Sequence, residues 1–322
     1  MKIKEFETFV VGNPPPRFGG RYFLFVKLVT DTGIVGYGEV YAATFGAETI
    51  AGMIADTAER HVVGHDPFHI EALFHRVYGS GYSLRPDISL VGVLSGLEMA
   101  CWDIIGKACD KPVYELLGGQ VHDRLRTYTY LYPADGDVYP SDQDDQHIYV
   151  NADVAAQRAL DYVEQGFTAV KFDPAGAYTV YDGGMPTLEE LDRSERFVTT
   201  IRAAVGDRAD LLFGTHGQFT AAGALRLAKR LEACDPLWFE EPTPPENTRE
   251  MARVAAGTTI PVATGERLCT KHEFARVLQA GAAAILQPNL GRVGGLLEAK
   301  KIAALAEVYY AQIAPHLYCG PI

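Results

Sequence analysis

The chain has 322 residues, of which 48% are hydrophobic, and it carries a formal net charge of −12. This length suits about two domains with substantial cores, and the negative charge argues against nucleic acid or an anionic membrane as a partner. No apolar run approaches the roughly 20 residues needed to span a bilayer, and no secretory signal follows Met1. Five widely spaced cysteines without a C-x-x-C motif predict reduced thiols in a cytoplasmic protein.

The N-terminal part has two kinds of pattern. Residues from about 2 to 42 are rich in aromatic and β-branched positions and contain an Asp-Thr-Gly turn at 31–33, which predicts antiparallel strands joined by a hairpin. From about 47 to 119 the apolar residues recur with a helical period. Together these stretches predict an α+β capping domain over residues 1–120.

The rest of the chain, residues 121–322, repeats a pattern of strand, loop and helix. Strands are predicted at 126–130, 169–172, 211–214, 237–240, 261–264, 284–287 and 311–314. Amphipathic helices lie between them, for example at 188–205, 221–233 and 294–309. The later units recur about every 25 residues, which is typical of a (β/α) barrel of the TIM type. A doubly wound sheet is the alternative, but successive units without a dinucleotide fingerprint favour the barrel.

The number of predicted barrel strands is seven, and the sequence stops just past the last of them. A closed barrel needs an eighth strand, so we expect a barrel that lacks its last strand, C-terminally truncated, or one closed by something else. An open barrel exposes strand edges, which predicts poor stability or association.

Several predicted strands end in a residue that can bind a metal or move a proton. The runs are LLFGTHG (211–217), LWFEEP (237–242), PVATGER (261–267) and AQIAPH (311–316). The carboxyl ends of barrel strands converge on one face of the fold, so these side chains are predicted to form one active site.

Longer motifs resemble one enzyme family, the enolase superfamily. They are SGLEMACWDIIGKACDKPVYELLGG (95–119), AVKFD (169–173), FEEP (239–242), ATGERL (263–268), QPNLGRVGG (287–295) and APHLYCGPI (314–322). They are similar to the mandelate racemase/muconate lactonising group, and most of all to its galactonate-type acid-sugar dehydratases. The resemblance implies an α+β cap over a barrel, Mg²⁺ at the barrel's C-terminal face, and abstraction of a proton α to a carboxylate.

The resemblance implies an incomplete set of metal ligands. Glu240 and Glu266 match the second and third metal carboxylates, with ion pairing at strand ends as the alternative. The first ligand of the family is normally an Asp, and here that position is Gly214. Asp210 begins the same strand and so lies at the opposite face. His216 is then a possible third ligand, although Mg²⁺ prefers oxygen donors.

The resemblance also implies the groups that move protons. His216 matches a histidine that protonates the departing β-hydroxyl, and His316 matches the general base. The Asp that supports this base is replaced by Asn289, which predicts a lower pKa for His316. Lys171 matches the base on the opposite face in racemases, but Asp173 should keep it protonated. The alternatives are a helix-capping loop residue for His216 and a buried, hydrogen-bonded residue for His316.

Substrate choice is expected to depend on the cap. The loop at 12–21 corresponds to one that family members fold over the active site, where Arg17, Arg21 or Tyr22 could meet distal hydroxyls or a second carboxylate. Solvent-facing hairpin residues are the alternative. The acidic stretch at 135–145 is predicted to be a solvated loop.

The sequence therefore predicts a Mg²⁺-dependent dehydratase of a sugar acid of the aldonate type. His316 would take the C2 proton, Glu240 and Glu266 would hold the metal, and His216 would help to expel the C3 hydroxyl, giving a 2-keto-3-deoxy acid. One alternative is a racemase, epimerase or cycloisomerase that uses Lys171 and His316. The other is a degenerate barrel that only binds ligand. The expected partners are a small carboxylate substrate and further copies of the chain in a homo-oligomer.

Overall fold

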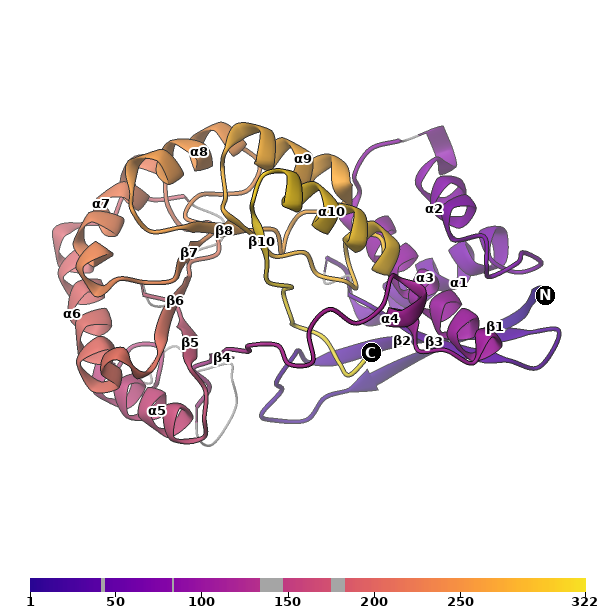
Figure 1. Cartoon of the computed structure of the whole chain (residues 1–322), viewed down its shortest axis with the longest axis horizontal. Coiled ribbons are helices and arrows are strands. Elements are labelled where there is room, and N and C mark those ends of the chain that lie inside the picture. Colours follow the sequence, from indigo (N-terminus) through magenta and orange to yellow (C-terminus); the bar gives the residue numbers. More distant parts are fainter. Residues whose placement is uncertain (42–43, 83, 134–146, 175–182) are drawn as a thin grey trace.

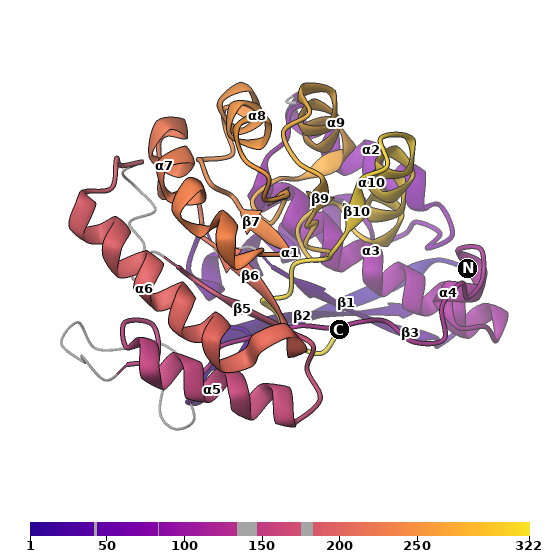
Figure 2. The same cartoon turned by 60° about the vertical axis from the view of Figure 1, so that its left-hand side comes forward.

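The computed structural model describes residues 1–41, 44–82, 84–133, 147–174 and 183–322. The predicted acidic loop at 135–145 lies outside these residues. A small antiparallel sheet with its helices lies beside an arc of parallel strands that is wrapped on its outer side by a row of helices (Figures 1 and 2).

The cap is built on a three-stranded antiparallel sheet. Its strands are β1 (Ile3–Gly12), β2 (Tyr22–Thr30) and β3 (Val35–Val40), paired in that order. Burial alternates along β2, where Leu24, Val26 and Leu28 face the core. The cap helices are α1 (Ala47–His61), α2 (Ile70–Tyr78), the 3₁₀ turn η1 (Ser80–Tyr82), α3 (Ile88–Cys109) and α4 (Val113–Leu116).

The central helix of the cap is α3. Asp87 caps it by accepting hydrogen bonds from the backbone N–H groups of Ser89 and Leu90. Contrary to the prediction that no apolar run reaches such a length, α3 is long and apolar enough to cross a membrane, with a mean hydropathy of 1.6. However, 83% of that stretch is buried inside the molecule, as in the core helix of a globular domain.

The second sheet contains seven strands, all parallel, in the order β10-β9-β8-β7-β6-β5-β4. Their bounds are β4 (Thr129–Tyr130), β5 (Ala169–Phe172), β6 (Asp210–Gly214), β7 (Trp238–Glu240), β8 (Val262–Thr264), β9 (Ile285–Leu286) and β10 (Gln312–Ile313). β4 and β10 are the edges, so the sheet is a partial barrel. The predicted α/β class, a barrel of the enolase type with an α+β cap, is confirmed.

Helices cover the outer side of this sheet. They are α5 (Ala152–Glu164), α6 (Leu188–Val205), α7 (Ala221–Leu231), α8 (Thr248–Gly257), α9 (Thr270–Ala280) and α10 (Leu296–Val308), with the 3₁₀ turns η2 (Gly206–Arg208) and η3 (Glu232–Cys234). Side-chain caps start several of them: a capping box of Thr187 and Glu190 begins α6, and Thr220 begins α7.

The alternation of side chains along the strands aims the polar residues inward. Phe172, Phe213 and Phe239 belong to the core between strands and helices. Ala169, Leu212 and Trp238 lie two positions from Lys171, Gly214 and Glu240 and form a second cluster inside the arc. Because side chains two residues apart share a face, Lys171, Gly214 and Glu240 face the interior of the arc at the carboxyl ends of the strands.

The cap and the barrel are joined by buried polar contacts. The carboxylate of Glu98, in α3, accepts hydrogen bonds from the N–H groups of Leu296 and Leu297 at the start of α10, at 2.8 and 3.0 Å. The C-terminal segment returns to the cap, where the Gly320 N–H donates to Glu39 of β3 at 2.5 Å (Figure 1). These contacts fix the strand ends of the barrel against the cap.

Candidate functional site

The predicted site residues meet at the carboxyl ends of the parallel strands. Gly214 is the register partner of Glu240, and Lys171 comes from the adjoining strand β5. Glu266, Asn289 and His316 follow β8, β9 and β10, so sequence-distant residues converge as expected for a barrel.

Lys171 and Glu240 form a buried ion pair. Lys171 Nζ lies 2.5 Å from Glu240 Oε1, and the two residues are 5% and 1% exposed. The other carboxylate oxygen, Oε2, accepts a hydrogen bond of 2.6 Å from Gln287 Nε2. Burial works against the charge of Lys171, but the Glu240 carboxylate outweighs it and raises the pKa of Lys171. The contact with Glu240 therefore favours the ammonium form of Lys171.

Gly214 makes room for this ion pair. A Cβ atom at position 214 would lie 2.7 Å from Lys171 Cε and 3.6 Å from its Nζ. The lysine side chain thus fills the space beside Glu240 that a side chain at position 214 would otherwise enter.

His316 is held between Asn289 and Glu266. Its Nε2 lies 3.4 Å from Glu266 Oε2, and its Nδ1 lies 2.9 Å from Asn289 Nδ2. The Gly291 N–H donates to Asn289 Oδ1 at 2.9 Å, so the amide NH₂ is the group that faces His316. This NH₂ donates to Nδ1, and the neutral imidazole must then carry its proton on Nε2. Burial lowers the pKa of His316, and the nearby Glu266 only partly offsets it.

His216 lies beside a different carboxylate. Its Nδ1 is 3.8 Å from Asp173 Oδ2, and its backbone is left-handed, with φ of 51°. Burial lowers the pKa of His216, but its interaction with Asp173 and the charge of Glu266 outweigh burial and raise it. Burial alone would raise the pKa of Glu266. The pKa is instead lowered to about 2 by three neighbours, His316, His216 and Lys171.

Three neighbouring residues have roles that the sequence did not predict. Gln287 binds Glu240, as described above. Glu241, which is fully buried, accepts a hydrogen bond from Arg267 Nε at 2.8 Å and forms an ion pair with Nη2 of the same arginine at 2.7 Å. Burial, and then the charge of Glu266, raise the pKa of Glu241 to about 7. In the sequence, the one sign of these roles was that each residue lies directly after, or close to, the end of a predicted strand.

The donor set does not fit a divalent cation. Gly214 supplies no oxygen, and both oxygens of Glu240 are engaged by Lys171 and Gln287. Among the described residues, no group of three or more His, Cys, Asp or Glu side chains is arranged to hold a metal. Mg²⁺ takes about six oxygen ligands, several of them usually water, and beside Glu240 it would meet the charge of the Lys171 ammonium. In this arrangement Glu240, Glu266 and His216 are thus not grouped as a ready set of metal ligands.

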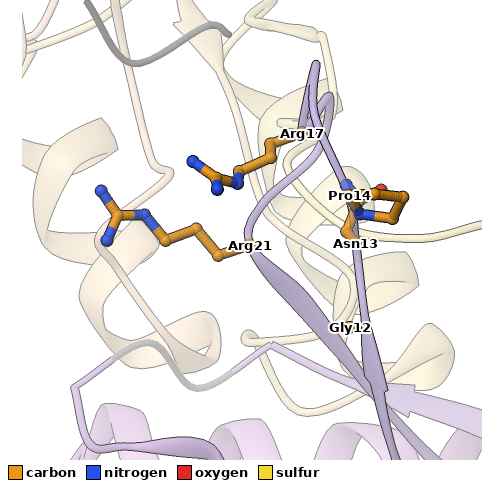
Figure 3. Close-up of a pocket in the computed structure, with 5 residues that line it drawn as sticks. All are labelled: Gly12, Asn13, Pro14, Arg17 and Arg21. Atoms are coloured by element: carbon orange, nitrogen blue, oxygen red, sulfur yellow. The ribbon is translucent and has the colours of Figure 1, made fainter. Parts of the chain in front are cut away.

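A cavity of about 530 Å³ opens at the loop between β1 and β2. It is lined by Gly12, Asn13, Pro14, Arg17 and Arg21, and Figure 3 shows both guanidinium groups extending to the same side of the loop. The Asn13 amide pins the loop by donating to the carbonyls of Phe18 and Gly20.

The same loop reaches the barrel. The ring of Phe18 lies 4.7 Å from that of Tyr132, which follows β4. The two arginines are therefore carried by a cap loop that contacts the strand-end face of the barrel.

Comparison with known proteins shows the same two-part organisation. The family described as Enolase C-terminal domain-like matches residues 154–322, and the N-terminal domain of mandelate racemase / muconate lactonizing enzyme matches residues 18–118. A D-galactonate dehydratase of Ralstonia nicotianae is 36% identical over all of this chain and 76% of its own length. A D-xylonate dehydratase of Haloferax volcanii is 34% identical over 98% of this chain and 72% of its own.

Solved structures agree with these matches. A protein from Labrenzia alexandrii DFL-11, named after the mandelate racemase/muconate lactonizing enzymes, has a TM-score of 0.94 and 68% identity over all of this chain and 80% of its own. A mandelate racemase/muconate lactonizing enzyme from Sulfitobacter sp. has a TM-score of 0.94 and 55% identity, with the same coverage.

Proposed function

The chain belongs to the enolase superfamily, in its mandelate racemase/muconate lactonizing enzyme group, and from this premise we propose that it is a lyase that removes water from a sugar acid. The C2–H bond and the C3–O bond break, and a C2–C3 double bond forms. The proton and the hydroxide leave as one water, and the enol tautomerises to a 2-keto-3-deoxy acid. Relatives named D-galactonate and D-xylonate dehydratase support this class of substrate.

The observation that carries the proposal is the pair of histidines on either side of Glu266. His216 follows β6 and His316 follows β10, and these strands lie on either side of β8, which Glu266 follows. Elimination of water needs one group that accepts the α-proton and a second that protonates the leaving hydroxyl. Two imidazoles at one barrel mouth meet that need.

The pKa shifts of the two histidines favour the division of labour that the family resemblance implies. Burial lowers the pKa of His316, and an imidazole held neutral suits a proton acceptor. Burial also opposes the charge of His216, but Asp173 and Glu266 outweigh it and raise the pKa of His216, which suits a proton donor. We therefore assign His316 as the base and His216 as the acid.

Lys171 does not suit the alternative of a racemase or epimerase. Such a reaction needs a second base on the opposite face of the substrate, and Lys171 is held as an ammonium by Glu240. Its charge instead suits electrostatic stabilisation of an anionic intermediate.

Enolase-superfamily enzymes generally use a divalent metal, and the prediction for this chain was Mg²⁺. We leave Mg²⁺ out of the proposed reaction because the donor set does not fit it. The arginines of the loop at 12–21 support a polyhydroxy acid that carries a distal hydroxyl or carboxylate within reach of the cap.

A substrate screen tests this function. The protein would be incubated with five- and six-carbon aldonates and aldarates, and semicarbazide would detect 2-keto products. We expect a keto product from at least one acid. An epimerised acid without keto product would support the racemase alternative instead. Binding of sugar acids by thermal shift, with no conversion of any of them, would support the degenerate barrel.

A further inference from the structure

Glu240 and Glu266 form a carboxylate pair at the barrel mouth, and the positively charged side chain of Lys171 lies beside it. Glu240 and Glu266 are 1% and 8% exposed, and two buried carboxylates near each other are costly without a compensating charge. The compensating charge nearest to Glu240 is the Lys171 ammonium, at 2.5 Å. The ring of Tyr128 lies 6.0 Å from the same ammonium and closes another side.

Lys171 and Gly214 form a matched pair. The 2.7 Å approach of a Cβ at position 214 to Lys171 Cε means that a side chain there and this lysine conformation exclude each other. An Asp at position 214 would add a third carboxylate beside Glu240, its register partner, but only if the lysine moved away. The position of the Lys171 ammonium beside Glu240 therefore depends on the absence of a side chain at position 214.

We propose that the Lys171 ammonium, admitted by Gly214, takes the position beside Glu240 that a divalent cation would occupy, so that this site carries a built-in cation and does not bind Mg²⁺ at millimolar concentrations. The statement about the metal is independent of any activity.

The test measures binding of Mn²⁺, a paramagnetic substitute for Mg²⁺, from the loss of the free-ion signal in electron paramagnetic resonance. Wild type is expected to leave Mn²⁺ free up to millimolar concentrations. The double variant Lys171→Ala/Gly214→Asp removes the ammonium, clears space and supplies the third carboxylate. We expect it to bind one Mn²⁺ at least tenfold more tightly than wild type.

The matched control is Lys171→Ala/Gly214→Asn, which has the same shape at 214 without the charge, and circular dichroism checks the folding of each variant. Stoichiometric binding of Mn²⁺ by wild type below 1 mM (an assay limit of order K ~ 10³ M⁻¹) would overturn the proposal, and this part needs no variant. Binding by the folded Asp double variant that is no tighter than that of wild type would also overturn it, and the Asn double variant shows how much of any gain comes from the charge at 214. Because no substrate is present, neither result depends on whether the protein is a dehydratase.

Discussion

At the level of single residues, the site depends on pairs of side chains that are far apart in the sequence, such as Lys171 with Glu240 and Asn289 with His316. Lys171 was expected to be kept protonated by Asp173, but the carboxylate that contacts its Nζ is that of Glu240, which is 69 positions away. Asn289 was expected beside His316 and is there. The direction of its hydrogen bond, however, depends on the Gly291 N–H, and only the folded backbone shows this.

The assignment of the two histidines gives a prediction at the same scale. With an acid that wild type converts, the reaction would be run in D₂O and the recovered acid examined by NMR. His216→Asn should slow elimination by about 100-fold or more, the usual contribution of a general acid. It should still exchange the C2 proton for deuterium, because the base remains.

His316→Asn should lose both exchange and elimination, since it lacks the group that accepts the proton. The reverse pattern, exchange kept in His316→Asn and lost in His216→Asn, would make His216 the base and His316 the acid.

At the level of helices and strands, prediction was best where local chemistry sets the boundary. The predicted helix at 188–205 matches α6, whose start is fixed by the Thr187–Glu190 capping box. The predicted strand at 126–130 is shorter in the structure, where β4 is Thr129–Tyr130. Arg126 instead binds Asp210 at 2.6 Å, a contact with a distant strand that no local pattern reveals.

The contact of β3 with α3 gives a prediction at this scale. A Cβ on Gly38 would overlap the carbonyl oxygen of Gly96 in α3, a backbone atom that cannot move aside. Gly38→Ala should therefore lower the free energy of unfolding by about 2 kcal/mol or more, as measured by urea denaturation.

The matched control is Gly52→Ala in α1, where no described residue lies within 4 Å of the added Cβ. Alanine is about 1 kcal/mol better than glycine inside a helix, so this variant should be at least as stable as wild type. Equal stabilities of the two variants would show that the sheet and α3 can separate without cost.

At the level of the whole molecule, the sequence predicted seven barrel strands and a cap, and the structure contains both. It could not predict how the two are joined. The bond from Leu296 to Glu98 connects residues 198 positions apart, and a glutamate within an apolar helix gives no sign of its distant partner. Such contacts depend on the packing of complete elements and not on local pattern.

This junction predicts a pH effect on stability. Burial outweighs the three hydrogen bonds to Glu98 and raises its pKa from 4.5 to about 7. The folded state then binds the Glu98 proton more tightly than the unfolded state does. The stabilisation that this difference contributes is fully present below pH 4.5 and is lost as the pH rises to about 7. At 1.36 kcal/mol per pKa unit the loss is of the order of 3 kcal/mol.

Glu98→Gln cannot ionise and should lack this pH dependence. The difference in Tm between wild type and Glu98→Gln, measured by calorimetry, should fall from pH 4.5 to 7. A difference that stays constant or rises over this range would mean that the folded protein holds the Glu98 carboxylate in its charged form.

The central claim is that this enolase-superfamily chain eliminates water with two histidines and a built-in lysine cation. The most direct measurement is conversion of sugar acids by protein freed of metals and assayed by NMR with an excess of EDTA. Formation of a 2-keto-3-deoxy acid at the rate seen without EDTA is the predicted result. Product that forms only after Mg²⁺ is restored would contradict the role of Lys171, and no product under either condition would contradict the lyase.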